Sequence, residues 1–248
     1  MIQYQYMKVY VQNTWIEDDD LELLKYIDTH VGERVMFDSS MLIDNENSHE
    51  DISMIFADTQ IIQKLLLKRG WNCPDTYDNA YDGLYNRQIK QIKYKDSKTL
   101  EKPFFIKPYN NDKSFESIIV ERDDDFRYLQ ESEGLLDDDD IYTSNVVKFL
   151  NEYRLFIGNN KIYGITESTK YILDRPESES EPPKEFICEI NKRTLDGKYV
   201  VVDVGLLSTG EWAVVEVNPP FSLSSYDYPI DKYYQYCYDA FNSCYNSK

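Results

Sequence analysis

The chain has 248 residues, which is enough for one large domain or two small ones, and 42% of them are hydrophobic, which is enough for a buried core. Acidic residues outnumber basic ones by 45 to 27, and the resulting net charge of −18 argues against nucleic acid or an anionic membrane surface as a partner. The four cysteines lack metal-type spacing, and no stretch resembles a signal segment or a transmembrane helix, so we expect a cytoplasmic protein with reduced thiols. Translation could start at Met1 or at Met7.

Strand-like and helix-like segments alternate over the first 95 residues. Apolar, β-branched segments predict strands, and segments with apolar residues three and four apart predict helices. The predicted strands cover residues 8–12, 35–37 and 52–56, and the predicted helices cover residues 21–27 and 61–68. Gly70 is in place to end the second helix. This alternation predicts a small α/β unit.

A further helix is predicted after Pro74, which interrupts the pattern. It covers residues 81–92. Arg87 lies on it and could face a functional site or solvent, and solvent is the simpler interpretation.

Two lysines bracket the next predicted turn. Lys107 lies in an apolar strand over residues 103–108, and Lys113 precedes a strand over residues 115–120. Two cations on either side of a turn could hold a triphosphate from both sides. The ordinary alternative is a hairpin with one snorkelling and one exposed lysine. The apolar residues before Lys107 favour a functional role for it, whereas Lys113 fits either interpretation.

The middle of the chain combines a helix, an acidic run and two strands. A short helix is predicted within residues 123–136. The acidic run at 137–140 is predicted to be a solvated loop, because adjacent carboxylates repel and cannot all face one ion. A strand over 146–150 continues through 155–157, turns at Gly158, and returns over 161–166.

The strand that passes through residue 150 carries candidate ligand-binding groups. An apolar edge at Phe149 and Leu150 could seat an adenine ring, and Glu152 beside it could accept a hydrogen bond from a ribose hydroxyl. Glu152 and Arg154 are two residues apart on one strand face, so an ion pair between them is the ordinary alternative. A phosphate role is favoured for Arg154, because its planar guanidinium suits phosphate oxygens.

The strongest strand pattern in the chain is a hairpin over residues 198–218. Two β-branched runs, 199–204 and 212–217, flank a short turn that contains Gly210. A polar loop precedes this hairpin, and its end is marked by prolines that cannot continue a central strand. Before the hairpin come a loop over 176–183 and a helix over 184–195 that closes near Gly197. After it come Pro219 and Pro220 and then a C-terminal helix over 230–244.

Three polar residues interrupt the apolar strands of this hairpin. Glu216 and Asn218 project from the same face, and antiparallel pairing could bring Asp203 beside them. Ordinary solvent-facing positions are the alternative, which is accepted for Glu211 at the turn. It is rejected for the other three because a buried carboxylate must be paired or bound to metal. Two carboxylates and an amide suit a hard divalent cation with oxygen ligands.

These segments together resemble the ATP-grasp superfamily, and within it a small clade named for one arginine and two lysines. The resemblance spans about residues 74–241 and rests on PFFIKPYNNDKSF, NEYRLFIGNNKIYGI and VVVDVGLLSTGEWAVVEVN. It implies an α/β (α+β) ATP-grasp fold. Residues 1–95 would be a pre-ATP-grasp α/β domain that helps form the substrate cleft, and residues 96–248 would be the ATP-grasp domain.

The resemblance also implies roles for individual residues. Lys107 and Lys113 would contact the phosphates of ATP, and Arg154 would bind the γ-phosphate or an acyl phosphate. The implied adenine hinge comprises Lys148, Phe149 and Leu150, with Glu152 near the nucleotide. The implied Mg²⁺ ligands are Asp203, Glu216 and Asn218.

Two segments depart from the family pattern. The loop between the lysines has Asn110-Asn111-Asp112 where many relatives have glycines that cover phosphates, and glycine is also absent after Phe115. After Asn218 the usual glycine-containing segment is replaced by PPFSLSSYDY, which leaves the acceptor substrate open.

Three functions follow from this resemblance, in descending order. The first is an ATP-dependent ligase that joins a small-molecule or peptide carboxylate to an amine through an acyl phosphate, with ATP and Mg²⁺ as cofactors. The second is a small-molecule kinase on the same fold. The third is a catalytically silent nucleotide-binding module, which the complete set of candidate site residues disfavours.

Overall fold

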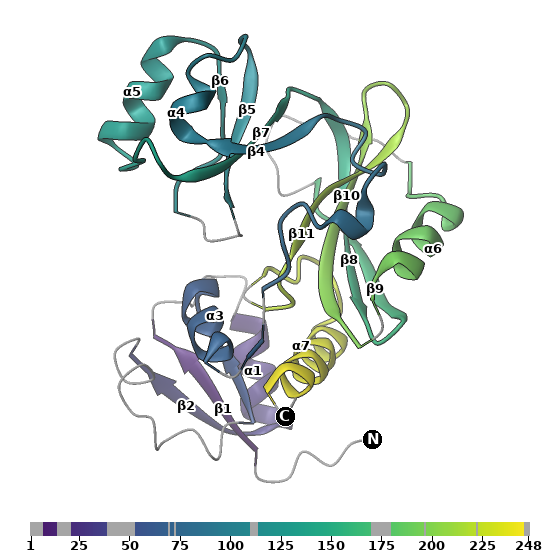
Figure 1. Ribbon diagram of the computed structural model, residues 1–248. Coiled ribbons are helices and arrows are strands. Elements are labelled where there is room, and N and C mark those ends of the chain that lie inside the picture. Colours follow the sequence, from purple (N-terminus) through teal and green to yellow (C-terminus); the bar gives the residue numbers. More distant parts are fainter. Residues whose placement is uncertain are drawn as a thin grey trace.

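The computed structural model describes residues 7–13, 21–38, 53–68, 70–71, 73–109, 114–169, 180–195, 197–221 and 223–245. Its described strands form three sheets, each accompanied by helices (Figure 1). The predicted α/β class is confirmed. No helix in this described part is long and apolar enough to cross a membrane.

The N-terminal unit is a three-stranded parallel sheet with two helices. Its strands are β1 (Met7–Gln12), β2 (Gly32–Phe37) and β3 (Met54–Phe56), in the order β2-β1-β3, and its helices are α1 (Leu21–His30) and α3 (Thr59–Leu67). All five elements overlap the predicted ones. Gly70, just beyond α3, has a φ of +83°, the left-handed conformation that glycine adopts readily at helix ends.

The second sheet has the order β4-β7-β5-β6 and is antiparallel at each pairing. Its elements are β4 (Ile89–Lys93), α4 (Tyr94–Ser97), β5 (Phe104–Pro108), β6 (Ile118–Val120), α5 (Asp123–Glu131) and β7 (Asp140–Asn145). Buried Phe104, Ile106 and Leu129 belong to the core between this sheet and its helices.

The predicted helix over residues 81–92 is wrong. Residues Asn79–Tyr81 form a short 3₁₀ helix, and the end of the predicted helix is strand β4. β4 pairs along its whole length with β7, so tertiary hydrogen bonding outweighs the helix-like spacing of its residues. The strand predicted over 146–150 is also misplaced, because β7 ends at Asn145 and the next strand begins at Phe149.

The acidic run at 137–140 is exposed to solvent, as predicted. Three of its carboxylates pair with lysines of β4, of α4 and of the position directly after α4. The pairs are Lys93 with Asp140 at 2.8 Å, Lys95 with Asp138 at 2.6 Å and Lys98 with Asp137 at 2.6 Å. Such exposed pairs contribute little stability each.

The third sheet has the order β11-β10-β8-β9 and is antiparallel throughout. It contains the predicted hairpin, and helix α6 packs on it through the buried Ile190. The elements are β8 (Phe149–Gly158), β9 (Lys161–Glu167), α6 (Lys184–Arg193), β10 (Tyr199–Leu207) and β11 (Trp212–Asn218).

Helix α7 (Ile230–Tyr245) joins the N-terminal unit to the third sheet, and it lies beside both in Figure 1. Tyr234 packs toward the N-terminal unit, with its ring centroid 6.2 Å from that of Phe56. Tyr236 is buried toward the sheet, where its hydroxyl donates to the Val200 carbonyl at 2.8 Å. The two units therefore share one core cluster.

The division of the chain into residues 1–95 and 96–248 stays a proposal. β4 lies in the second sheet, and Tyr77, Tyr81 and Tyr85 pack with the core of the third. These contacts associate the segment from about residue 73 with the second part of the chain.

Gly164 in β9 provides a test of packing in this core. A Cβ at this position would overlap the ring of Tyr228, which also stacks on Phe156 with centroids 4.8 Å apart. Gly164→Ala must displace that ring, and overpacking of this kind costs about 1–3 kcal/mol. We expect urea unfolding to show a loss of stability in this range.

The control is the same substitution in a Tyr228→Ala background, where the obstructing ring is gone. The cost of Gly164→Ala should then be much smaller. Equal costs in both backgrounds would show that the Tyr228 ring is not the cause.

Candidate functional site

One row of polar side chains crosses three neighbouring strands of the third sheet. Glu216 of β11 pairs in register with Asp203 of β10, which pairs in register with Arg154 of β8. Asn218 lies two residues beyond Glu216 and shares its face. The structure thus brings together the three residues proposed from the hairpin, and it adds Arg154 to the same row.

The amide of Asn218 links the two carboxylates of this row. Its Nδ2 donates to Oδ2 of Asp203 and to Oε1 of Glu216, both at 3.0 Å. Asp203 and Asn218 are both buried. One amide therefore holds the two carboxylates close together at the end of β11.

Arg154 is paired with Asp203 in a two-pronged contact. Its Nε and Nη2 donate to the two carboxylate oxygens at 2.9 Å each, and Nη1 donates to the Ser224 carbonyl at 3.0 Å. Burial opposes the positive charge, but the charge and hydrogen bonds of Asp203 outweigh it and raise the pKa of Arg154 above its ordinary value. The guanidinium remains charged, and its ion-pair partner is Asp203 on the neighbouring strand.

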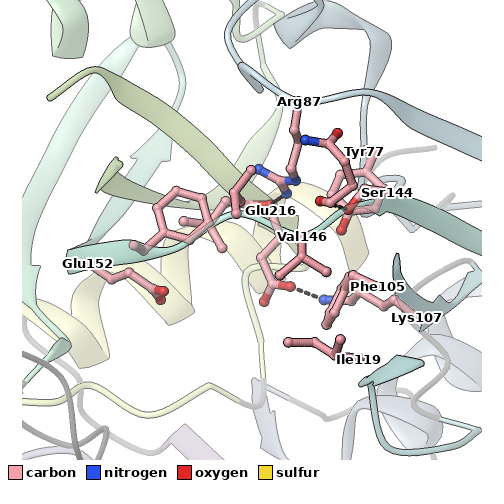
Figure 2. A pocket seen from close by; sticks show the side chains of 13 residues that line it. Tyr77, Arg87, Phe105, Lys107, Ile119, Ser144, Val146, Glu152 and Glu216 are labelled. Carbon is pink, nitrogen blue, oxygen red and sulfur yellow. Dashed lines mark hydrogen bonds and ion pairs between the residues drawn. The ribbon is translucent and has the colours of Figure 1, made fainter. Parts of the chain in front are cut away.

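Lys107 reaches this row from the second sheet. It lies on β5, and its Nζ forms an ion pair with Oε2 of Glu216 on β11. The pair thereby spans the two sheets, and Figure 2 shows it at the centre of a pocket. Lys113, the second lysine of the prediction, lies outside the described residues.

A cavity of about 240 Å³ lies between the second and third sheets, next to Glu216. It is smaller than the roughly 300–1,000 Å³ of sites that enclose a drug-sized ligand, so it suits one end of a longer molecule. Its lining is mostly apolar, with a few polar groups. The lining residues are Tyr77, Arg87, Phe105, Lys107, Ile119, Ser144, Asn145, Val146, Val147, Phe149, Glu152, Val215 and Glu216.

The predicted hinge residues are only partly in this lining. Phe149 and the buried Glu152 line the cavity. Among the described residues, Val146 and Val147 line it in place of Lys148 and Leu150. Lys148 is exposed, and its carbonyl accepts a hydrogen bond from the Ser208 amide at 2.9 Å. The shift follows from the connection between β7 and β8, which passes the cavity before β8 begins.

The prediction that Arg87 faces solvent is wrong. Its guanidinium lies in the cavity wall, 5.3 Å from the ring centroid of Tyr77 and 5.6 Å from that of Phe149 (Figure 2). Nη1 donates to the Val214 carbonyl at 2.9 Å and Nη2 to the Val215 carbonyl at 2.5 Å. No local pattern reveals this position, because it depends on where the segment lies against β11.

The segment that carries Arg87 covers the outer edge of β11. The Val214 amide donates to the Leu84 carbonyl at 2.8 Å, and the Val217 amide donates to the Thr76 carbonyl at 2.9 Å. An edge strand presents unpaired backbone groups, and this segment satisfies them without forming a strand itself. It therefore fixes the strand that carries Glu216 and Asn218.

A sequence model for an ATP-grasp domain, family 2 of the clade named for one arginine and two lysines, matches residues 84–236. The chain belongs to this family. The match contains the cross-strand row and most of the residues around the cavity. None of the curated proteins compared with the chain matches it.

Solved structures of ATP-grasp enzymes resemble this family member across nearly its whole length. D-alanine–D-alanine ligase from Bacillus anthracis, complexed with ATP, has a TM-score of 0.59 at 16% identity, over 98% of this chain and 100% of that chain. A RimK domain ATP-grasp protein from Sphaerobacter thermophilus has a TM-score of 0.56 at 14% identity, over 95% and 98%. N5-carboxyaminoimidazole synthetase from Staphylococcus aureus has a TM-score of 0.55 at 14% identity, over 96% and 78%. These likenesses confirm the predicted ATP-grasp fold.

The side chains at the end of β11 fit Mg²⁺, whose ligands come partly from phosphates and water, better than a metal whose ligands all come from the protein. In the described part of the chain, no three His, Cys, Asp or Glu residues gather into a metal-binding group. Mg²⁺ is usually bound by one or two carboxylates together with phosphates and water, and Asp203 and Glu216 supply that number. The two hydrogen bonds turn Nδ2 of Asn218 toward both carboxylates, so Asn218 would add a third oxygen only with its amide turned over, with Oδ1 in the place of Nδ2.

Arg87→Met tests whether this side chain holds β11 in place. Hydrogen bonds from a charged donor contribute about 1.5–3 kcal/mol each, so losing two of them should loosen the edge strand. We expect the amides of Val214 and Val217 to exchange hydrogen for deuterium at least about tenfold faster.

Arg34→Met is the matched control, because it removes an exposed bidentate pair with Asp28 in the N-terminal unit. It should leave those two amides unchanged. Slow exchange in Arg87→Met, equal to that of the unsubstituted protein, would assign the edge contacts to the backbone alone.

Proposed function

We propose that the protein is an ATP-dependent carboxylate–amine ligase that forms an acyl phosphate and releases ADP and phosphate. The observation that carries this proposal is the cross-strand row of Arg154, Asp203, Glu216 and Asn218, with Lys107 at its end and an apolar cavity beside it. That combination offers cations for phosphates, oxygens for a metal and an apolar surface for a base.

The structural neighbours support a nucleotide in this site. One of them is described as complexed with ATP, and another as an ADP complex of N5-carboxyaminoimidazole ribonucleotide synthetase. The names of several neighbours describe ligases or synthetases. They share the fold with this chain, and the ligase activity of the chain itself is our inference from its own site residues.

The cavity would hold the adenosine end of ATP. Phe105, Ile119, Val146 and Phe149 give it apolar walls on which a planar base can pack. Glu152 lines this cavity and would accept a hydrogen bond from the ribose, which is the role proposed from the sequence. Lys148 and Leu150 would contribute to the hinge only by supporting their chain neighbours Val147 and Phe149, which line the cavity. From this cavity the triphosphate would extend toward Lys107 and Glu216, with Lys113 a proposed second phosphate contact.

Asp203, Glu216 and Asn218 would hold Mg²⁺, which when bound neutralises phosphate charge and polarises the phosphoryl oxygens. Lys107 and Arg154 would bind the oxygens of the transferring phosphoryl group. A positioned cation stabilises charge more in a site that excludes water than in solution, and Arg154 is buried. Arg154 would keep this contact while the phosphoryl group moves to the acid and while the amine displaces phosphate.

The remaining elements of the proposal concern partners and location. The partners are a small-molecule or peptide carboxylate and an amine, and the cytoplasmic location predicted from composition remains part of the proposal. The N-terminal unit would help to form the substrate cleft.

The ion pairs of the cross-strand row predict that its charged side chains exchange partners when ATP binds. Each carboxylate already has a cation partner, since Lys107 pairs with Glu216 and Arg154 pairs with Asp203. Metal alone must compete with Lys107 for Glu216, whereas phosphates would draw that lysine away. Lys107→Met should therefore weaken ATP binding about tenfold or more, and it should strengthen Mn²⁺ binding in the absence of nucleotide.

Calorimetry for ATP and electron paramagnetic resonance for Mn²⁺ measure the two effects. Lys102→Met, which removes an exposed pair with Asp123 in the same part of the chain, is the control and should change neither. Glu216→Gln should weaken Mn²⁺ binding with or without ATP. A loss of nucleotide-free Mn²⁺ binding in Lys107→Met would contradict the exchange.

A product assay separates the ligase from a kinase. Candidate amino acids and short peptides are supplied as carboxylate and amine, and ADP, phosphate, AMP and hydroxamate are followed together. We expect ADP and phosphate in equal amounts only when both substrates are present, and hydroxylamine should trap the activated acid as a hydroxamate. A stable phosphorylated product without free phosphate would support the kinase. AMP with pyrophosphate would overturn both proposals.

A further inference from the structure

The loop between β11 and α7 is held at both of its ends. Phe221 packs against Trp71 and Phe241, with ring centroids 5.8 and 6.3 Å apart. At the other end, the ring of Tyr228 stacks on Phe156, and the Tyr228 hydroxyl donates to the Tyr163 carbonyl at 2.5 Å. The described residues between these anchors, 223–227, include Tyr226.

Tyr226 has an unusual backbone conformation for a large side chain. Its φ is +50°, in the left-handed region that favours glycine. Residues in this region cost free energy, and the surrounding structure must hold them there, which happens most often at functional sites. The two anchors fix the chain on either side of Tyr226.

The ring of Tyr226 lies over the guanidinium of Arg154, with Cζ 4.7 Å from the ring centroid. The same loop contributes the Ser224 carbonyl, which accepts a hydrogen bond from Nη1 at 3.0 Å. One loop therefore contacts both a face and an edge of this cation. Asp203 holds a second edge.

Arg154 retains donors for a ligand after these contacts. A guanidinium has five N–H groups, and within the described part of the chain three of them donate to Asp203 and Ser224, which leaves one on each terminal nitrogen. Donors on both terminal nitrogens suit the oxygens of a carboxylate or a phosphoryl group. Their direction depends on how the guanidinium plane is held.

We propose that Tyr226 is a positioning residue that sets the plane of Arg154 for the phosphoryl group and for the acid that accepts it. This inference rests on the proposed function. An aromatic ring on one face attracts the cation and excludes water from that face. Because the donors lie in the plane of the guanidinium, a ring that fixes this plane also fixes the directions in which they point. Tyr226 is half-buried, and its neighbours Ser224 and Asp227 are exposed, so this part of the loop lies at the surface beside Arg154.

The test compares Mg²⁺–ADP with Mg²⁺–ADP plus aluminium fluoride, a mimic of the transferring phosphoryl group. Affinities are measured by calorimetry in Tyr226→Leu, Tyr226→Phe and the unsubstituted protein. In Tyr226→Leu the affinity for ADP should stay the same, and the added affinity from aluminium fluoride should fall about threefold to tenfold. Tyr226→Phe keeps the ring and should retain the full gain.

Tyr128→Leu, which changes an exposed tyrosine on α5, is the control and should match the unsubstituted protein. If Mg²⁺–ADP does not bind the unsubstituted protein, the proposed nucleotide site fails. If ADP binds but aluminium fluoride adds no affinity in any protein, or adds the same in Tyr226→Leu, the role of Tyr226 is overturned while the nucleotide site stands. A loss in Tyr226→Phe equal to that in Tyr226→Leu would overturn it as well, because the hydroxyl and not the ring would then matter.

Discussion

The pairing register of three antiparallel strands brings the charged residues of the candidate site together. It places Arg154, Asp203 and Glu216 side by side across β8, β10 and β11. A shift of one residue in any of these pairings would turn a charged side chain to the opposite face of the sheet. Buried charges must be paired, so the two carboxylates and their two cations stabilise this register only as a set. The same requirement means that a ligand can take one charged side chain of this set only by replacing its ion-pair partner.

The second sheet completes the set with one lysine. Lys107 lies on β5, and its ion pair with Glu216 joins two sheets that are otherwise separate hydrogen-bonded units. Both residues of the pair line the cavity, so a ligand that enters between the sheets would meet the pair. Arg87 acts from the other side of β11, where it binds two carbonyls of the strand and packs on the aromatic wall. The strand that carries Glu216 and Asn218 is therefore held along its edge by Arg87 and the segment around it.

The parts of this site that the sequence predicts are those set by local periodicity. Alternation along the hairpin is enough to bring Glu216 and Asn218 to one face, and the apolar runs around Asp203 indicate its burial. The partner of Arg154 depends on register between strands far apart in the chain, so the sequence left Glu152 as the ordinary candidate. β4 and Arg87 were misjudged for a related reason. Three tyrosines four residues apart, at 77, 81 and 85, have helical spacing, but they pack on the third sheet from a segment that combines turns with a short 3₁₀ helix, Asn79–Tyr81.

The N-terminal unit is connected to the cross-strand row through packed aromatic rings. Tyr234 of α7 packs on Phe56 of that unit, and Tyr236 of the same helix is buried on the third sheet. Phe221 lies between Trp71 and Phe241, so the loop that covers Arg154 is anchored on residues outside the sheet that carries Arg154. Two tyrosines suit this position, because Tyr228 and Tyr236 each bury a ring while the hydroxyl donates to a backbone carbonyl, that of Tyr163 and that of Val200.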